Sequence, residues 1–527
     1  MMTMRCHWHK RLGHGKACIF WAILCAAWSG LLVTSVDEGA RAQTPAEPTE
    51  VQLGKVLQES WDALYLEGVK SGYVHHRFQE VSIRGKAFIW ATSSLELTVK
   101  RFGQLLTMSL SVANYETPTG QVASITIAMQ VGRDQRIVRR GTVLGQELVM
   151  QVQFGQQPPR EVRIPWTPEA LGLYTEERFF TAQDWSPGQE RSYIKFVPEL
   201  DRFVRSYVKA EEYEVGPHTR GGKWLRLRQR FDKVANLEVP DVVLWLDEQK
   251  QLARQETVWP GLGKMTLVRT TKEHALAPAG APSVDIGFQH IVRLPERIPN
   301  AVHCQKIVYR LQMRSGEFPE GLFPQDERQR LLRREAKLIE LEVLGSVVPP
   351  VKGTGTYEPP AEYLRSNQVV NSEDKLVQEL ARRAVGAETD PWQKALRIER
   401  WVHANMKRGT FTEAFASADE VARTRVGDCT EHAVLAAAMC RAVGVPSRLV
   451  MGLAYVEQLQ ALVPHMWLEA WIAGRWYGLD PTLGRGSLPA THIKISHHSW
   501  NDVTPLRPLA VFRTLFPHLA AEALRWE

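Results

Sequence analysis

Apolar and polar residues alternate along much of the first half of the chain. Clear examples are the runs from Leu106 to Val112, from Ala123 to Met129 and from Leu148 to Phe154. An alternation with a period of two is typical of strands that turn one face to a core and the other to water. Because such runs recur, we expect a large antiparallel β domain over residues 51–275, with one wetted face. It contains no catalytic constellation, so we interpret it as a docking or spacing domain.

Two proline-containing joins, Ala275 to Pro282 and Val348 to Pro360, divide the remainder of the chain and are typical of linkers. Between them, residues 283–350 contain short strand-like runs, which predict a small mixed or β linking region. After residue 360 the apolar period changes to that of helices, from Asp374 to Ala384 and from Pro391 to Met406. We therefore expect a separate domain at residues 360–527.

A further helix is predicted from Thr430 to Ala442, where Ala, Leu and Met dominate and glycine and proline are absent. Asp428 is a good N-cap, and Glu431 completes a capping-box pattern. Cys429 then takes the first helical position, near unpaired N–H groups and the positive end of the helix dipole. This environment favours the nucleophilic thiolate. An isolated cysteine at a helix start is usually only a small buried residue, so the interpretation depends on its partners.

A hairpin that ends at Asp480 supplies those partners. His465 to Ile472 alternates as in a half-buried strand, and Arg475 to Asp480 is predicted as its neighbour, joined through Ala473-Gly474. With a two-residue turn, Asp480 lies on the face of His465 one diagonal step away, at a Cβ separation of roughly 7–8 Å. A carboxylate there can orient the imidazole, whereas a slip of one residue would send it to the other face.

These residues resemble the transglutaminase-like superfamily, whose papain-like core places a Cys at a helix start and a His and an Asp on following strands. The resemblance covers about residues 360–485 and rests on three ordered blocks: Arg425-Val426-Gly427-Asp428-Cys429, His465-Met466-Trp467 and Asp480-Pro481-Thr482. It implies an α+β chain in which a papain-like, transglutaminase-like core follows the antiparallel β domain. It also implies that Cys429 is the nucleophile, His465 the general base and Asp480 the orienting residue.

The resemblance further implies an oxyanion hole made by the Cys429 backbone N–H and one upstream side chain, which the sequence does not locate. The constellation implies acyl transfer through a thioester. Water as the acceptor gives hydrolysis of a peptide or isopeptide amide, and a lysine-type amine gives a crosslink. The motifs do not choose between them; we expect hydrolysis because water is the default acceptor. We expect neither a cofactor nor a metal.

Several neighbouring residues have two interpretations. His432 is an alternative base or a structural polar residue near the helix start. Trp467, Trp471 and Trp476 either wall a substrate groove or pack around the hairpin. His497-His498 lacks the further ligand that a zinc site needs. Two other functions remain open: a binding module or scaffold that keeps the papain-like core without turnover, and a protein that binds metal through Cys429, His432 and His465.

The start of the chain predicts export. Basic residues up to Lys16 precede an apolar run from Ala17 to Val36, and Ala40-Arg41-Ala42 offers a cleavage site. This is the layout of a signal peptide over residues 1–42, although an uncleaved leader of this length would anchor the chain in a membrane. We expect a periplasmic or secreted protein that touches the membrane only through an uncleaved leader.

Cysteine content and charge limit the classes of partner that the protein is expected to bind. Three cysteines remain after the leader, Cys304, Cys429 and Cys440, which is too few for a disulfide scaffold in an exported protein of this length. The formal net charge is +7, but the chain contains no dense Lys/Arg tract with interleaved aromatic residues. Nucleic-acid binding therefore has no support. The expected partners are a protein or peptide substrate and a component of the cell envelope.

Overall fold

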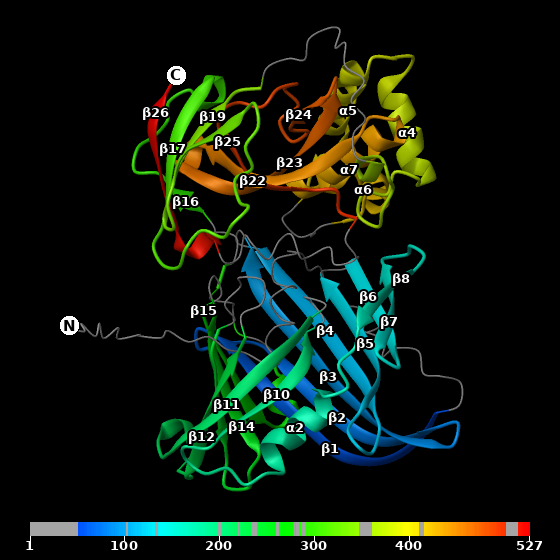
Figure 1. The fold of residues 1–527 in the computed structure, drawn as a ribbon, viewed down its shortest axis with the longest axis vertical. Coiled ribbons are helices and arrows are strands. Elements are labelled where there is room, and N and C mark those ends of the chain that lie inside the picture. The colour runs from blue at the N-terminus through cyan, green and yellow to red at the C-terminus, as the bar shows by residue number, and fades with distance from the viewer. Residues whose placement is uncertain are drawn as a thin grey trace, which may run out of the picture.

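The computed structural model describes residues 51–527 except 102–103, 132–134, 198–201, 220, 233–239, 260–262, 279, 281–283, 286–290, 347–360, 410–415 and 502–514. Figure 1 shows a lower body of strands and an upper body of helices and strands. Strands make up 52% and helices 19% of the structure, so the chain is more strongly β than the predicted α+β class implies. The predicted signal peptide lies outside the described residues. Within them, no helix combines the length and the apolar character needed to cross a membrane.

The lower body is a single 15-stranded sheet. Its strands are β1 (Val51–Leu66), β2 (Val69–Ile83), β3 (Lys86–Arg101), β4 (Gln104–Glu116), β5 (Val122–Val131), β6 (Gln135–Leu144), β7 (Glu147–Phe154), β8 (Arg160–Pro165), β9 (Ala170–Leu171), β10 (Glu190–Val197), β11 (Arg202–Glu214), β12 (Trp224–Phe231), β13 (Val242–Leu246), β14 (Leu252–Trp259) and β15 (Gly263–Thr270). Consecutive strands are neighbours except β8 and β9, which lie at the two ends of the order, and β1 also pairs with β15. Only the β9–β10 pair is parallel among these described strands. The predicted large antiparallel sheet is confirmed.

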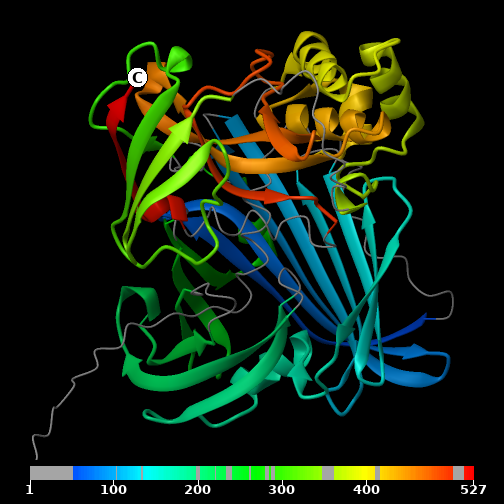
Figure 2. The same ribbon diagram turned by 45° about the horizontal axis from the view of Figure 1, so that its top comes forward.

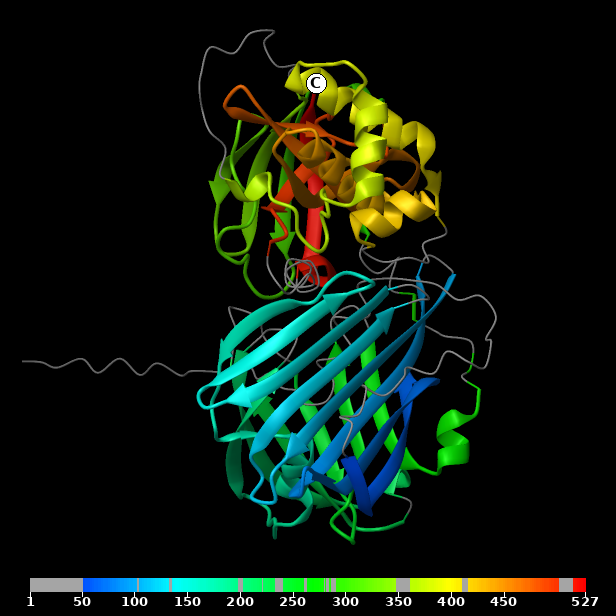
Figure 3. The same cartoon turned by 90° about the vertical axis from the view of Figure 1, so that its right-hand side faces the viewer.

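Alternating burial explains why these residues form a sheet. In β7, Leu148, Met150 and Val152 are fully buried, while the residues between them are partly exposed. The sheet curves, so that the green strands of its second half lie behind the blue and cyan strands of its first half (Figure 3). Helix α2 (Leu173–Thr181) packs against β3, β4 and β9. The apolar faces thus form a common core, and the opposite faces remain in contact with water.

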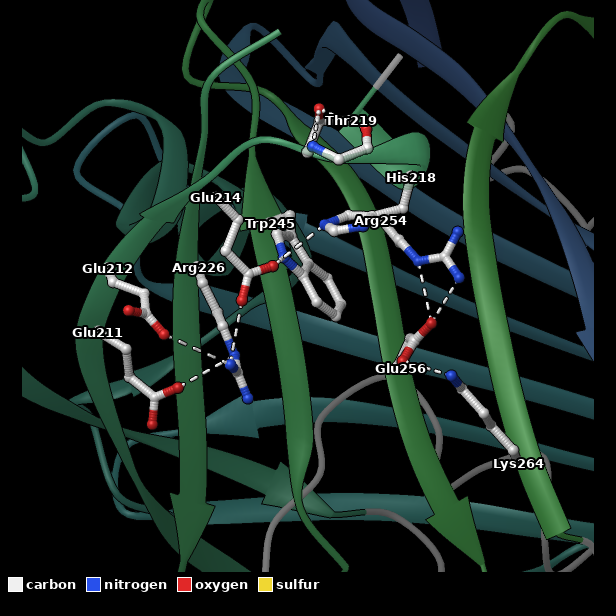
Figure 4. Close-up of polar contacts among 11 residues, drawn as sticks. Glu211, Glu212, Glu214, His218, Thr219, Arg226, Trp245, Arg254, Glu256 and Lys264 are labelled. Atoms are coloured by element: carbon white, nitrogen blue, oxygen red, sulfur yellow. Dashed lines mark hydrogen bonds and ion pairs between the residues drawn. The ribbon is translucent and has the colours of Figure 1, made fainter. Parts of the chain in front are cut away.

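The wetted face of β11–β15 carries a network of ion pairs (Figure 4). Arg226 lies within ion-pair distance of three carboxylates, and Glu256 is shared by two cations. The contacts join Arg226 to Glu211, Glu212 and Glu214, and Glu256 to Arg254 and Lys264. Pairs that remain partly exposed each contribute little stability. They place charges of both signs next to one another on this face.

The upper body contains a five-stranded sheet in the order β16-β23-β22-β25, with β24 paired to β23, and a four-stranded sheet in the order β18-β19-β17-β26. The strands are β16 (Val292–Arg293), β17 (Lys306–Met313), β18 (Gln329–Arg334), β19 (Leu338–Leu344), β22 (Ser447–Val456), β23 (Ala461–Ile472), β24 (Arg475–Leu479), β25 (His492–His498) and β26 (Leu519–Trp526). The short strands β20 (Lys407–Arg408) and β21 (Val426–Gly427) pair separately.

Residues 283–350 and 360–527, which the sequence separates, share both of these sheets. β16 extends the five-stranded sheet at β23, and the C-terminal β26 pairs along β17. Each sheet therefore combines strands from before and after the join near residue 350. Pairing over such sequence distances leaves no local pattern, so the proline-rich join does not mark a boundary between the sheets.

Helices gather beside β22 and β23 (Figure 2). They are α4 (Lys375–Val385), α5 (Pro391–Asn405), α6 (Ala418–Thr424) and α7 (Cys429–Ala442); α3 (Lys272–Leu276) and the 3-10 turns η1 (Pro217–Thr219), η3 (Ala301–His303), η4 (Ala361–Tyr363), η5 (Glu457–Leu459) and η6 (Phe516–His518) lie elsewhere. Asp374 and Asp390 cap α4 and α5 by accepting backbone N–H groups, and Pro391 opens α5. The three helices predicted in this region are confirmed.

The prediction that the His465–Ile472 strand is half-buried is wrong. On its polar face Trp467 is 0% and Glu469 1% exposed. Glu469 is buried because it pairs with Arg448 of β22, at 2.6 Å, and with Lys494 of β25, also at 2.6 Å. Burial raises the pKa of Glu469, but these two cations outweigh it and bring the pKa to about 2. The charged triad thus lets a polar face lie inside the protein.

The two bodies contact each other through the turn after β7. Gln157 donates to the carbonyl oxygen of Gln368 at 2.7 Å and to the Asp419 carboxylate at 2.9 Å. In return, Gln368 donates to the carbonyl oxygen of Val152 at 3.0 Å. Asp419 belongs to α6, the helix that precedes Cys429 in the chain. The lower body therefore contacts the upper body close to the segment that leads into the site.

Candidate active site

Cys429 is the first residue of α7, as the capping pattern predicts. The Asp428 side chain accepts the Thr430 N–H at 2.8 Å, and the Glu431 side chain accepts the Asp428 N–H at 2.9 Å. Both halves of the capping box are therefore formed. The sulfur lies at the positive end of a 14-residue helix, where the first-turn N–H groups have no partner within the helix.

The turn before Cys429 is fixed by strand pairing and by a buried acid. β20 pairs with β21, and the Gly409 N–H donates to the Gly427 carbonyl at 3.1 Å. Gly427 has no space for a side chain, because an added Cβ would lie 2.3 Å from Glu431 Cβ. Burial raises the pKa of Glu431 well above its ordinary value, and the nearby Asp428 charge adds to the effect. This close packing sets the position at which α7 begins.

β23 and β24 form the predicted hairpin. Their register pairs Ile472 with Arg475, which leaves Ala473-Gly474 as a two-residue turn. Both turn residues have positive φ, 48° and 83°, as in a type I′ turn. The register is therefore the predicted one. It brings Asp480, the residue directly after β24, to His465.

His465 lies between the other two predicted site residues. Its Nε2 is 2.7 Å from Asp480 Oδ2. The ring has only one other nitrogen, Nδ1, and the Cys429 side chain is close enough to His465 to contribute to the pKa of the ring. Since Nε2 contacts the carboxylate, Nδ1 is the ring nitrogen that is left to interact with the sulfur. The structure therefore brings together all three residues singled out in the sequence.

The electrostatics of this group favour a charged imidazole. Burial lowers the pKa of His465, but the charges of Asp480 and Cys429 and the hydrogen bonds with both raise it well above its usual value. Burial also acts to raise the pKa of Asp480, but His465 and His492 outweigh it, and the pKa lies well below its usual value. Asp480 is thus ionised and His465 protonated at neutral pH. An imidazolium beside a sulfur stabilises the thiolate.

α5 supports the loop that follows Asp480. The Asp480 Oδ1 accepts the Thr482 N–H at 2.8 Å, and His403 Nδ1 lies 3.1 Å from the Thr482 carbonyl oxygen. Glu399 accepts the Gly486 N–H at 2.8 Å. Burial raises the pKa of Glu399 to about 8, and the charge of Asp480 contributes to this rise. Glu399 is therefore neutral at pH 7 and adds no second negative charge beside Asp480.

Replacing Glu399 with glutamine is expected to remove a pH dependence of stability. The folded pKa of about 8 exceeds the ordinary value of 4.5, so the native state binds more protons than the unfolded state between these pH values. The free energy of unfolding therefore falls as pH rises through this window, by at most about 5 kcal/mol. The Glu399→Gln variant should lack that fall. Urea unfolding at pH 5, 6, 7 and 8 measures it.

The exposed Glu379 provides the control, because Glu379→Gln makes the same exchange on the surface of α4. This control should change the pH dependence little. A stability difference between the native protein and Glu399→Gln that is the same at pH 5 and pH 8 would contradict the assignment of a neutral Glu399.

Comparison with protein families assigns this part of the chain. Residues 378–481 match the transglutaminase-like superfamily. This segment is a transglutaminase-like domain. Cys429, His465 and Asp480 all lie within it. The 15-stranded sheet and the four-stranded sheet lie outside the matched residues.

Solved structures resemble larger parts of the chain only distantly. A candidate cysteine protease of Cytophaga hutchinsonii is 17% identical, with 42% of this chain and 86% of that chain covered and a TM-score of 0.28. A beta-barrel-like protein with a domain of unknown function, from Brucella abortus, is 10% identical, with 40% and 95% covered and a TM-score of 0.28. A candidate protease of Parabacteroides distasonis is 11% identical, with 66% and 63% covered and a TM-score of 0.17. Scores this low carry no argument about this chain. Among curated proteins, none matches.

His492 borders the transglutaminase-like domain and was missed in the sequence. It is the first residue of β25, and its Nε2 lies 3.2 Å from Asp480 Oδ2. The one available signal is the polar alternation of His492, Lys494 and Ser496 in a strand with isoleucines between them. That pattern predicts a polar strand face and names no partner, because β25 reaches the site only through its pairing with β22.

The possible metal ligands that converge in the structure differ from the set considered in the sequence analysis, which was Cys429, His432 and His465. Among the described residues, the ligand atoms of His465, Asp480 and His492 lie within 4.8 Å of one another. His432 is not part of this group. Its Nδ1 lies 2.7 Å from the Asp428 carbonyl oxygen, and burial lowers its pKa. His432 therefore supports the start of α7, which favours its structural interpretation. The pair His497-His498 does not join a converging set in the described part of the chain.

The tryptophans of the transglutaminase-like domain mainly pack against other rings. Trp467 is 0% exposed, and its ring lies beside His465 and His492, with centroid distances of 6.3 and 5.3 Å. Trp471 and Trp476 pack edge to face across the hairpin at 5.1 Å. A wall of an open groove is excluded for Trp467 because its ring has no exposed surface. The packing interpretation therefore accounts for all three contacts.

The second oxyanion donor has no assignment in the described contacts. The Cys429 backbone N–H is suitably placed in the first turn of α7. Residues 410–415, between β20 and α6, lie outside the described residues. The pairing of β20 with β21 brings the backbone of Lys407 and Arg408 next to the turn before Cys429.

Proposed function

We propose that this chain is an exported cysteine acyl-transfer enzyme of the transglutaminase-like type, which hydrolyses peptide or isopeptide amides through a thioester on Cys429. The observation that supports it most is the placement of His465, whose Nε2 lies 2.7 Å from Asp480 Oδ2 and whose ring also interacts with Cys429. Nucleophile, base and orienting acid come from a helix start, a strand and a loop. Such an arrangement is the geometric requirement for nucleophilic catalysis by cysteine.

The chemistry follows from this geometry. The Cys429 thiolate attacks the amide carbonyl carbon, and the negative charge that develops on oxygen lies near the N-terminus of α7. His465 then gives its Nδ1 proton to the leaving amine as the carbon–nitrogen bond breaks, which leaves a thioester. Water attacks the thioester while His465 takes a proton from it, and the thiolate is released. Asp480 keeps the ring oriented and stabilises its charged form.

Water is the proposed acceptor because Cys429 is partly exposed, so that solvent can reach a thioester formed there. An amine-bearing partner would yield a crosslink from the same intermediate. The substrate is a protein or peptide, and a cell-envelope component fits the predicted leader. The curved sheet of residues 51–270 contacts α6 and would serve as a docking or spacing element.

Selective alkylation tests this proposal against a scaffold that keeps the fold without turnover. In the native protein, iodoacetamide at pH 6 should modify Cys429 at least about tenfold faster than an ordinary thiol, because the His465 imidazolium and the positive end of α7 lie beside the attacking sulfur. Cys304 and Cys440 are buried and serve as internal controls. Peptide mapping by mass spectrometry gives the three rates. The His465→Ala variant should lose the enhancement, and a native Cys429 that reacts no faster than in urea would refute the proposal.

A further inference from the structure

The Asp480 carboxylate accepts three hydrogen bonds, one more than a simple orienting acid requires. His465 Nε2 and His492 Nε2 both lie at Oδ2, at 2.7 and 3.2 Å, and the Thr482 N–H donates to Oδ1 at 2.8 Å. Asp480 and His492 are 1% and 2% exposed, so water does not replace these contacts readily. Both carboxylate oxygens are therefore held: Oδ2 by the two histidines and Oδ1 by the loop backbone.

The protonation state of His492 suits a donor. Burial lowers its pKa to about 4, which outweighs the opposing effect of Asp480, while His465 and Arg328 lower it further. The ring is thus neutral at pH 7 and carries a single N–H. The Thr491 hydroxyl lies 3.1 Å from His492 Nδ1 and can donate to it, which places the proton on Nε2. A neutral Nε2–H then points at the carboxylate.

Small residues on β22 let His492 reach the site. β22 lies between β23 and β25, and it pairs Gly452 with His465 and Ala454 with His492. An added Cβ at Gly452 would lie 2.5 Å from the Trp467 ring. Because that side chain is absent, Trp467 occupies the space and packs edge-on against His492 at 5.3 Å. The ring of His492 is thereby fixed in orientation as well as in position.

β25 is in turn held by Phe323, from the segment between β17 and β18, and by Gln329, the first residue of β18. The Phe323 N–H donates to the Ile495 carbonyl at 3.1 Å. The Gln329 amide bonds to both backbone groups of Lys494, at 2.7 and 2.8 Å, as a neighbouring strand would. The Lys494 ammonium is paired with Glu469 at 2.6 Å. Residues outside the matched domain thus set the position of the strand that carries His492.

We propose that His492 is a positioning residue of this active site: its Nε2–H keeps the Asp480 carboxylate aligned with the His465 ring, and through it with Cys429. The inference rests on the proposed function. His492 does not touch the reacting atoms, and its effect passes through Asp480. Loss of this donor leaves the carboxylate free to rotate away from His465, which weakens the imidazolium that supports the thiolate.

Two substitutions separate positioning from packing. Phenylalanine fills the space of the His492 ring without a donor, whereas glutamine retains an N–H at a similar reach. The rate of Cys429 alkylation by iodoacetamide, followed from pH 4 to pH 9, is the readout. At pH 6 His492→Phe should react roughly tenfold more slowly than the native protein, with a changed pH profile. His492→Gln should recover to within about threefold, and thermal melting should show both variants folded.

Three results would overturn the proposal. One is a folded His492→Phe variant with the native pH profile and rate. Another is an equal loss in both variants that follows their melting temperatures, because it would show a packing role alone. The third is one equivalent of zinc in the purified native protein that His492→Phe abolishes, because the cluster would then be a metal site. If the native protein itself shows no enhanced alkylation, the proposed function fails, which is a different outcome from any of these.

A second measurement does not depend on whether the His492→Phe variant folds. In native protein labelled with ¹⁵N-histidine, one ring should remain neutral with its proton on Nε2 from pH 5 to pH 8. The signal is assigned by its loss in His492→Gln. A neutral His492 signal with its proton on Nδ1 would remove the Nε2–H donor, and the proposal with it.

Discussion

Replacing Cys429 with alanine is expected to abolish amide hydrolysis, with a loss of about 10⁵-fold or more in kcat. The expected loss is this large because the thioester route requires the sulfur, and no other described cysteine is exposed to replace it. Hydrolysis of a mixed library of peptide 4-nitroanilides, followed by release of nitroaniline, measures the effect. The acyl group on the native enzyme can be identified by mass spectrometry after acid quenching, and the variant should carry none.

The same exchange at Cys440 is the matched control. Cys440 lies in the same helix but is fully buried, so Cys440→Ala should keep the hydrolytic activity and lose some stability. Cys429→Ala should melt within a few degrees of the native protein, because its side chain is partly exposed. Hydrolysis that persists in Cys429→Ala at a comparable rate would exclude the cysteine mechanism.

Replacing Asp480 with asparagine is expected to lower kcat by about 10³-fold or more. The carboxylate accepts from both His465 and His492. Asparagine removes the negative charge that raises the pKa of His465, so that pKa should fall towards its ordinary value. The imidazolium needed to protonate the leaving amine is then lost at lower pH. The alkaline limb of the activity profile should therefore move to lower pH.

The pH dependence of hydrolysis from pH 5 to pH 10 distinguishes this effect from misfolding. Asp390→Asn makes the same exchange at the N-cap of α5, where asparagine is also a good cap, and should leave the profile unchanged. An Asp480→Asn variant that is folded and has the native profile would show that Asp480 does not act on His465.

The contacts of β25 bear on how much of the chain the site requires. Gln329 and Phe323 belong to the segment before residue 350, yet they bond along the strand that begins at His492. The matched domain at 378–481 ends before that strand. The four-stranded sheet therefore belongs to the same structural unit as the candidate site, although the sequence separates the two by a proline-rich join.

Local signals in the sequence are sufficient to predict the helix that carries Cys429 and the strand that carries His465. Asp428 and Glu431 mark the helix start because capping depends on residues within one turn. Ala473 is not a residue that favours the positive φ it adopts, so the hairpin register and the approach of Asp480 to His465 follow from the two-residue length of the turn and the alternation of the strands. The antiparallel sheet of residues 51–275 follows in the same way from alternation and short connections.

Features that depend on distant strands could not be derived in this way. Glu469 alternates with apolar residues like a solvent-facing side chain, but Arg448 and Lys494 enclose it from the flanking strands β22 and β25. His492 has no motif, because its partner Asp480 is reached across β23 and β22. By itself, the sequence determined the helix start, the hairpin and the antiparallel sheet, because each depends on short-range periodicity, capping and turn geometry. Only the tertiary structure decided the burial of the charged triad, the shared sheets and the second histidine on Asp480, because these depend on strand order, which pairs residues far apart in the chain.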